Sequence, residues 1–333
     1  MDTGNGIAPS EQQILETIAG VLEQPAMIRE DAHFDVNTRM IHTTDMLVEG
    51  THFELPFTSP EALGWKAGAV NISDIAAMGG RPANLLIALG LPPNVSLSWV
   101  AGLYRGLDEL CKAQKISIIG GDTVLAPVVT IAITAVGRLP EQHTPGFRTQ
   151  ARPGDLVMVT GPHGLSAAGL DALRAGRPGL ESSLKQAHLR PVPQVEAGLI
   201  LSRHSTRHAL MDSSDGLADA CLKIGAASNV RIVLSQDKLP RDPVMDEYAR
   251  TAGHDVWQWM YYGGEDYQLV ATAPHWMAAF ADHWHVVGRV EDVDGQPGAC
   301  VEDASGNVVE TFTTEKMYQH FAARPDSKTC MQG

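Results

Sequence analysis

Several familiar features are scarce or missing in this chain of 333 residues, and each absence excludes a class of protein. The four cysteines form no CxxC pair, so neither a disulfide framework nor a paired-cysteine zinc site is indicated, and free thiols fit a reducing compartment. No apolar run approaches the roughly 18 residues of a membrane span. Only 25 basic residues stand against 39 acidic ones, which argues against a general nucleic-acid binder.

The beginning of the chain and the catalytic motifs narrow the choice further. The first ten residues lack the basic region and the apolar core of a secretion signal, so we expect a cytoplasmic protein with no membrane partner. There is no GxxxxGK[ST] loop, no GxGxxG, no HExxH, no kinase-type catalytic loop and no GxSxG elbow. A covalent nucleophile is therefore not indicated.

What the chain does contain is a set of aspartates beside small residues. The spacing predicts a helix that begins near Leu63, ends at Gly79 and carries Asp74. Similar aspartate-bearing stretches recur at 43–45, 120–122 and 212–216. A single aspartate of this kind would be an ordinary solvent-facing carboxylate. Four such places predict one shared metal–phosphate site, because carboxylates beside small residues suit hard cations such as magnesium.

Six aspartates in one cleft would repel one another strongly without bound cations. Magnesium takes only one or two carboxylates per ion, so such a site could hold more than one magnesium around a polyphosphate. Arg148 is a candidate phosphate clamp, because a guanidinium binds two phosphate oxygens at once. The simplest mechanism is direct transfer between bound phosphates, with no side chain in a covalent role. The six aspartates are Asp31, Asp45, Asp74, Asp122, Asp212 and Asp215.

Apolar strands alternate with amphipathic helices along the chain, which predicts an α/β (α+β) fold. A stretch at 140–153, rich in Pro, Gly, Gln and Arg, is the expected junction between domains at 1–140 and 150–323, with a loose tail at 324–333. We expect helices at 10–24, 63–79, 96–115, 166–175, 194–203, 217–228, 243–252, 275–283 and 313–322. We expect strands at 38–48, 83–91, 115–119, 128–139, 155–160, 207–211, 230–234 and 285–290, and a hairpin at 300–310.

Six segments, in order, resemble the thiamine-monophosphate kinase family, a branch of the aminoimidazole-ribotide-synthetase-like (AIR-synthase-like) superfamily. They span roughly residues 28 to 275 and are Thr43–Phe53, Asn71–Gly79, Gly120–Thr123, Arg148–Asp155, Asp212–Leu217 and Gly263–Tyr267. The resemblance implies a two-domain AIR-synthase-like fold. Its N-terminal mixed sheet, backed by helices, would form a barrel with its twin across a homodimer, and its C-terminal domain would be an α/β sandwich.

The same resemblance implies an activity and a set of site residues. The activity is magnesium-dependent, in-line transfer of the γ-phosphoryl group of ATP to thiamine monophosphate, which gives thiamine diphosphate and ADP and uses several magnesium ions. The implied metal ligands are Asp31, Thr43, Thr44, Asp45, Asp74, Asp122, Asp212 and Asp215. The implied ATP contacts are Tyr104, Gly121, Asp122, Arg148 and Ser214, and the implied substrate contacts are His52, Glu265 and Tyr318.

The chain departs from the family pattern at two places. Near residue 30 the family favours Gly-Asp-Asp, where this chain has Arg29, Glu30 and Asp31. Near the C-terminus the family often has a tryptophan that stacks on the thiamine ring, where this chain has Glu315 with Tyr318 as the nearest aromatic residue.

Two other functions are compatible with the same motifs. One is a different ATP-using member of the superfamily, although the chain has no N-terminal cysteine of the kind that selenophosphate synthesis requires. The other is a non-catalytic nucleotide-binding regulator that keeps the fold. Magnesium-dependent ATP binding without thiamine diphosphate formation would favour the regulator.

Overall fold

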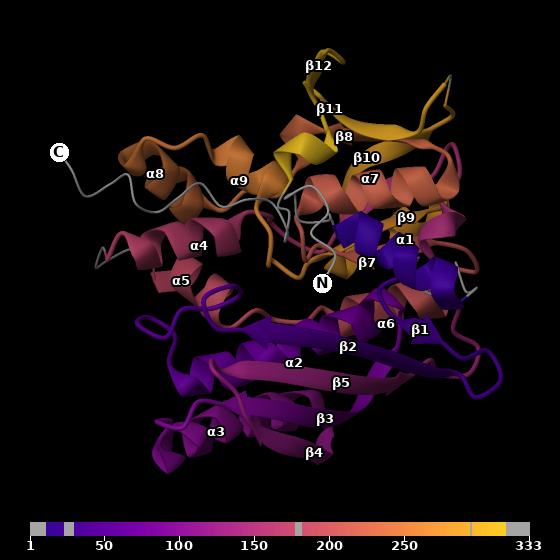
Figure 1. The fold of residues 1–333 in the computed structure, drawn as a ribbon. Helices are drawn as coiled ribbons and strands as arrows, with labels where there is room; N and C mark the ends of the chain where they lie inside the picture. Colours follow the sequence, from indigo (N-terminus) through magenta and orange to yellow (C-terminus); the bar gives the residue numbers. More distant parts are fainter. Residues whose placement is uncertain (1–10, 23–29, 177–181, 294, 318–333) are drawn as a thin grey trace.

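The computed structural model describes residues 11–22, 30–176, 182–293 and 295–317, and it builds them around two sheets (Figure 1). Helix α1 (Glu11–Leu22) precedes the first sheet. That sheet has the order β1-β2-β5-β3-β4, in which β3 and β4 are parallel and the other neighbours antiparallel. Its strands are β1 (His33–Phe34), β2 (Met40–Val48), β3 (Arg81–Leu91), β4 (Ser117–Leu125) and β5 (Thr130–Arg138).

The second sheet has the order β12-β11-β8-β10-β6-β9-β7 and is mixed, with β8 and β11 parallel. Its strands are β6 (Leu156–Val159), β7 (Ala209–Asp212), β8 (Arg231–Ser235), β9 (Leu269–Ala273), β10 (His285–Glu291), β11 (Gly298–Glu302) and β12 (Val308–Thr311). The helices of this half are α4 (Leu165–Arg174), α5 (Ser182–Leu189), α6 (Val195–His204), α7 (Leu217–Ser228), α8 (Pro243–Ala252) and α9 (Val256–Tyr262).

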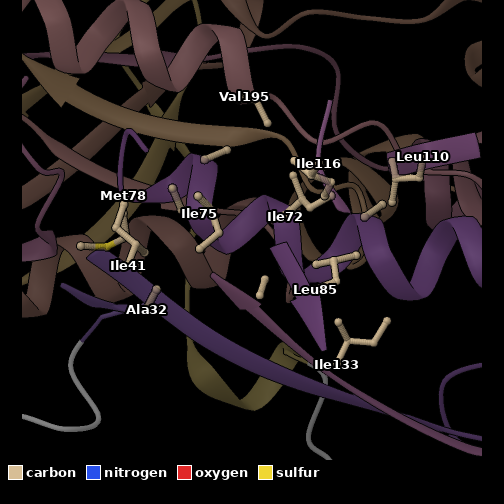
Figure 2. Packing of buried hydrophobic residues seen from close by; sticks show 14 of the residues in the cluster. Ala32, Ile41, Ile72, Ile75, Met78, Leu85, Leu110, Ile116, Ile133 and Val195 are labelled. Atoms are coloured by element: carbon tan, nitrogen blue, oxygen red, sulfur yellow. The ribbon is translucent and has the colours of Figure 1, made fainter. Parts of the chain in front are cut away.

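Helix α2 (Pro60–Ala77) lies between the two sheets. Ser59 caps its first turn by accepting a hydrogen bond from the Ala62 N–H, and Pro60 occupies the first position, where no hydrogen-bond donor is needed. Side chains of α2 pack on Ile41, Leu85 and Ile133 of the first sheet (Figure 2), while other contacts of the helix reach α6 and β7. The helix is therefore buried on nearly all sides, as a helix between two layers must be.

Alternation along the strands of the second sheet separates its two faces. On β7, Leu210 joins the hydrophobic cluster around α2, whereas Ala209 and Met211 join a second cluster beneath α7. The larger cluster thus contains residues from both halves of the chain. The predicted division into domains at 1–140 and 150–323 stays a prediction, since the sheets separate at that junction but one core connects them.

Most predicted elements are confirmed, and one is wrong in its extent. The strand expected at 115–119 continues to Leu125, so Gly120–Asp122 lies within β4 instead of forming a turn after it. The reason is tertiary: parallel pairing with β3, which resumes at Gly120 after a register shift, satisfies the backbone and outweighs the weak strand preference of glycine. The helix expected at 275–283 is a 3₁₀ helix.

The structure describes only part of the C-terminal end of the chain. Of the helix expected at 313–322, the described part holds a short 3₁₀ helix, Thr314–Lys316, and residues 318–333, with the predicted tail, lie outside the described residues. Within the described residues no helix combines the length and the hydropathy needed to cross a membrane.

Helix α3 (Leu97–Gln114) packs against α2 at a distance that only glycine permits. A Cβ at Gly64 would lie 1.9 Å from the carbonyl oxygen of Leu103, and a Cβ at Gly106 would lie 1.9 Å from that of Glu61. Both obstacles are backbone atoms, so they move only if the helices separate. The absence of a side chain at Gly64 and at Gly106 therefore permits the short distance between the two helices.

We expect Gly64→Ala to lower the free energy of unfolding by about 1–3 kcal/mol, because the added methyl group forces α2 and α3 apart. Urea unfolding followed by circular dichroism measures the change. The matched control is Gly20→Ala in α1, where an added Cβ meets nothing within 4 Å. Equal unfolding midpoints for Gly64→Ala and the unmodified protein would contradict this account of the helix contact.

Candidate functional site

Three aspartates from distant parts of the chain meet beside α2. Asp31 lies just before β1, Asp74 is on α2, and Asp212 ends β7. One carboxylate oxygen from each lies within 4.8 Å of the other two. Such a group of oxygen ligands fits a hard divalent cation.

Each of these carboxylates is oriented by a neighbour that binds only one of its oxygens. Thr43 Oγ1 donates to Asp74 Oδ2 at 2.5 Å, and Ser73 Oγ donates to Asp212 Oδ2 at 2.6 Å. Arg148 forms a hydrogen-bonded ion pair with Asp31 Oδ1. Asp31 Oδ2 and Asp212 Oδ1 are buried and have no hydrogen-bond partner. Buried oxygens of this kind are costly unless an ion or a ligand binds them, so the residues present fit a magnesium ion.

The pKa values of the carboxylates in and beside the cluster also indicate a site for a cation. Burial, and then the charges of neighbouring carboxylates, raise the pKa of Asp212 to about 8 and that of Asp45 to about 6. The same two causes raise the pKa of Asp74 well above its usual range. Without a cation the cluster therefore holds protons at neutral pH, and a bound divalent cation would replace them.

The acidic cluster opens into a cavity of about 970 Å³ between the two halves of the chain. Asp45 and Asp74 line it from the first half, and Ser214 and Asp215 line it from the loop between β7 and α7. Asp45 is also held in place, because its N–H donates to Asn71 Oδ1 at 2.9 Å. Other parts of the wall are His52, Phe57, Trp259, Tyr262 and Glu265. The cavity thus combines a cluster of carboxylates with aromatic and polar surface, as ligand sites commonly do.

Glu265 reaches this cavity from the loop between α9 and β9. Its carboxylate pairs with Lys66 Nζ at 3.0 Å and lies 3.5 Å from His188 Nδ1. Burial opposes ionisation of Glu265, but the nearby charges, that of Lys66 foremost, outweigh it and lower its pKa. The neighbouring Asp266 instead accepts hydrogen bonds from the N–H groups of Gly164 and Ser166 at the start of α4.

Two predicted metal ligands lie on the other face of the first sheet. Thr43 and Asp45 point toward α2, so Thr44 between them points away, and its hydroxyl donates to the carbonyl of Ile133 at 3.1 Å. Asp122 is on the edge strand β4, which β5 and β3 separate from β2 by roughly 14 Å. Within one chain, Thr44 and Asp122 therefore do not join the acidic cluster.

The other predicted contacts divide in the same way. Arg148 and Ser214 lie at the cluster and the cavity, and His52 and Glu265 line the cavity wall. Gly121 is on the exposed strand β4, and Tyr104 is a partly buried residue of α3 outside the cavity wall. Tyr318 lies outside the described residues. The described residues of the predicted set are thus divided between the cavity, strand β4 and helix α3.

Lys66, Ser73 and His188 contact Glu265 or Asp212, although the sequence motifs do not predict them. The sequence does distinguish Lys66, because it is the single charged residue between Glu61 and Asp74 in an otherwise apolar and small-residue helix. A lysine is almost never fully buried unless it is paired. Ser73 and His188 carried no such signal, since their partners lie 139 residues and 77 residues away in the sequence.

Comparison with known proteins places these features in a family. The family model described as "AIR synthase related protein, N-terminal domain" matches residues 23–139. A thiamine-monophosphate kinase from Synechococcus elongatus is 37% identical over 295 residues, which cover 85% of this chain and 87% of the relative. The counterpart from Bacillus subtilis is 38% identical over 250 residues, which are 73% of each chain.

Solved structures agree with the sequence comparison. A structure of AaThiL complexed with AMPPCP and TMP superimposes with a TM-score of 0.83 at 32% identity, covering 94% of this chain and 97% of the other. A structure of thiamine monophosphate kinase from Aquifex aeolicus gives a TM-score of 0.78 at 34% identity, covering 89% and 97%. These matches confirm the predicted AIR-synthase-like α/β fold, whereas the barrel across a homodimer stays a prediction.

We expect the metal-free protein to lose stability as the pH rises from 6.5 to 8. The pKa of Asp212 is about 8 in the folded protein against 3.8 as the ordinary value, so the folded state binds more protons than the unfolded state in this interval. Stability then falls with rising pH. Magnesium should oppose the loss, because it stabilises the ionised carboxylates. Melting temperatures with and without a chelator measure both effects.

The variant Asp212→Asn provides the contrast. It should show a flatter pH dependence and a smaller gain from magnesium, whereas Asp108→Asn, at an exposed carboxylate on α3, should behave like the unmodified protein. If magnesium raised the melting temperature of Asp212→Asn as much as that of the unmodified protein, Asp212 would be excluded as a magnesium ligand.

Proposed function

The chain belongs to the thiamine-monophosphate kinase family, and from this premise we propose that it transfers the γ-phosphoryl group of ATP directly to thiamine monophosphate. The products are thiamine diphosphate and ADP. The observation that carries the proposal is the meeting of Asp31, Asp74 and Asp212 beside a cavity large enough for a cofactor-sized substrate. The complex of the related AaThiL with AMPPCP, an ATP analogue, and TMP supports the same pair of substrates.

In this proposal the acidic cluster holds magnesium. Asp31, Asp74 and Asp212 would be shared ligands, and Asp45 and Asp215 would complete the set from the cavity wall. Bound magnesium would supply the positive charge that neutralises the phosphate oxygens during transfer. Thr43 takes a supporting part, since its hydroxyl already orients Asp74.

The nucleotide would bind where the cluster meets the loop after β7. Ser214 lines the cavity there, and Arg148 lies beside it in an ion pair with Asp31. Arg148 would hold phosphate oxygens with the part of its guanidinium that does not face Asp31. Gly121 and Asp122 on β4 would contact the nucleotide at a subunit interface, with Tyr104 reaching a neighbouring subunit's nucleotide.

The acceptor would occupy the cavity, with His52 and Glu265 as its polar contacts. The attacking group is the phosphate of thiamine monophosphate, which is already ionised at neutral pH, so a strong general base is unnecessary. Positioning and charge neutralisation would then provide the rate. The described aromatic residues of the wall are Phe53, Phe57, Trp259, Tyr262 and Tyr267, and Tyr318 stays a prediction.

The two departures from the family pattern have different consequences. Arg29 lies outside the described residues, but the neighbouring Glu30 accepts a hydrogen bond from the Arg148 N–H at 2.9 Å. Glu30 therefore helps to fix the arginine of the site. Glu315 is exposed in the last 3₁₀ helix and has no aromatic ring, so a stacking partner would come from the cavity wall or, as the resemblance implies, from Tyr318.

We also propose that the protein is a cytoplasmic homodimer whose first sheets face each other. Helices α2 and α3 cover one face of this sheet, and no described helix covers the other. On the open face Met46 is 55%, Leu86 38% and Val124 56% exposed, and strand pairing places Met46 and Leu86 on the same side as Asp122. Pairing two such faces would bury the apolar surface and bring Asp122 to the interface.

A charge on this face should break the dimer. We expect Val124→Lys to be a monomer at concentrations where the unmodified protein is a dimer, because the lysine cannot be buried unpaired at the interface. Light scattering after size-exclusion chromatography measures the mass. Leu97→Lys, at an exposed apolar residue that begins α3, is the matched control. A dimeric Val124→Lys would place the interface elsewhere.

The activity itself is tested with purified protein, ATP, magnesium and thiamine monophosphate. We expect thiamine diphosphate and ADP in equal amounts, and loss of both on chelation of magnesium. Asp74→Asn should lose at least about 100-fold in kcat, because it removes a central metal ligand, whereas Asp108→Asn should keep full activity. ATP binding without thiamine diphosphate would favour a regulator, and a normally active Asp74→Asn would refute the site.

A further inference from the structure

Lys66 is a buried lysine in the middle of α2, and its side chain is 1% exposed. Its ammonium group lies 3.0 Å from Glu265 Oε1, so the ion pair joins the helix at the centre of the molecule to the loop between α9 and β9. A buried charge of this kind is retained only where it is paired. Lys66 is not part of the cavity wall, whereas Glu265 is part of it and is 26% exposed.

The backbone of Glu265 is fixed independently of its side chain. Its φ is +65°, in the left-handed region that non-glycine residues rarely adopt, and its N–H donates to the carbonyl of Ser214 at 2.7 Å. The fixed backbone therefore places the side chain at the cavity wall. Contacts of the carboxylate must then determine its charge and its rotamer.

Of the two groups that pair with the carboxylate, Lys66 supplies the charge. His188 lies 3.5 Å from Glu265 Oε2, but burial, and then the charge of Lys66, lower its pKa to about 4, so it is neutral at neutral pH. The Nδ1 atom of His188 is also 3.0 Å from Ser166 Oγ. His188 thus limits the position of Glu265 without neutralising it.

We propose that Lys66 is a positioning residue that keeps Glu265 ionised and turned into the cavity, where the carboxylate binds the cationic part of thiamine monophosphate. The inference rests on the proposed function, because it concerns the same substrate. The thiazolium ring of thiamine carries a permanent positive charge, which an ionised carboxylate recognises and a protonated one does not. Lys66 and Asp74 are eight residues apart on α2, roughly 12 Å, so one rigid helix would set the distance between the carboxylate and the metal cluster.

The test is a double-mutant cycle in the full-length protein. The variants are Lys66→Met, Glu265→Gln and the double variant, with KM for thiamine monophosphate, KM for ATP and kcat measured for each. We expect Lys66→Met to raise KM for thiamine monophosphate about tenfold or more while KM for ATP stays within about twofold. In the double variant KM for thiamine monophosphate should equal that of Glu265→Gln alone, because Lys66 acts only through Glu265.

The matched control is Trp65→Phe. Trp65 is the neighbour of Lys66 on α2, and its Nε1 makes another contact between the halves of the chain, a hydrogen bond of 2.7 Å to the carbonyl of Pro191. Losing this contact should leave KM for thiamine monophosphate unchanged. A merely structural role for Lys66 would instead alter kcat and both KM values, and it would do so in the Glu265→Gln background as well.

The outcomes separate the two proposals. Unmodified protein that forms no thiamine diphosphate overturns the proposed function and this inference with it. Active unmodified protein with an unchanged KM in Lys66→Met overturns the inference alone, as does a double variant whose KM exceeds that of Glu265→Gln. If Lys66→Met does not fold, the double variant decides, because it leaves no unpaired charge in the core.

Discussion

The burial of α2 between two sheets is the constraint on which the rest of the structure depends. An ordinary surface helix hides one face, but this one contacts the first sheet on one side and α6 and β7 on the other. Small residues make that possible, since the helix approaches α3 closely enough for a Cβ at Gly64 to collide with backbone. Every polar residue in its buried part must therefore find a partner inside the protein, and Lys66, Asn71 and Ser73 each contact a residue or group of the site.

The burial of α2 also brings the carboxylates of the acidic cluster together inside the protein. Placing Asp74 and Asp212 in the buried cluster opposes folding, because desolvation and the charges of neighbouring carboxylates both disfavour their ionised forms. The surrounding residues hold one oxygen of each and leave the rest of the ligand set for a cation. In the proposed function, metal and phosphate would relieve this repulsion on binding, so ligand binding and stability would be linked.

Much of this arrangement could be predicted from the sequence, and the reasons for the remainder are specific. Local signals were sufficient for α2, for the strand containing Asp45 and for the loop at 212–216. The resemblance groups Thr44 and Asp122 with the other metal ligands, and the sequence alone does not show how far apart their strands lie in the sheet. That depends on strand order, and β5 and β3 come between β2 and β4. The partnership of His188 and Glu265 depends on tertiary contact, which no local spacing shows.

The loop between α9 and β9 shows how adjacent residues divide structural and functional roles. Glu265 and Tyr267 both have positive φ, at +65° and +52°, a conformation that costs on the order of 1 kcal/mol or more for each residue. Asp266, between them, offsets this strain by capping α4 through two backbone N–H groups, at 2.5 Å and 2.9 Å. The N–H of Ser213 adds a bond of 2.8 Å to the carbonyl of Gln268. The contacts that hold the loop therefore do not involve the Glu265 side chain. Its carboxylate can pair with Lys66 and face the cavity at the same time.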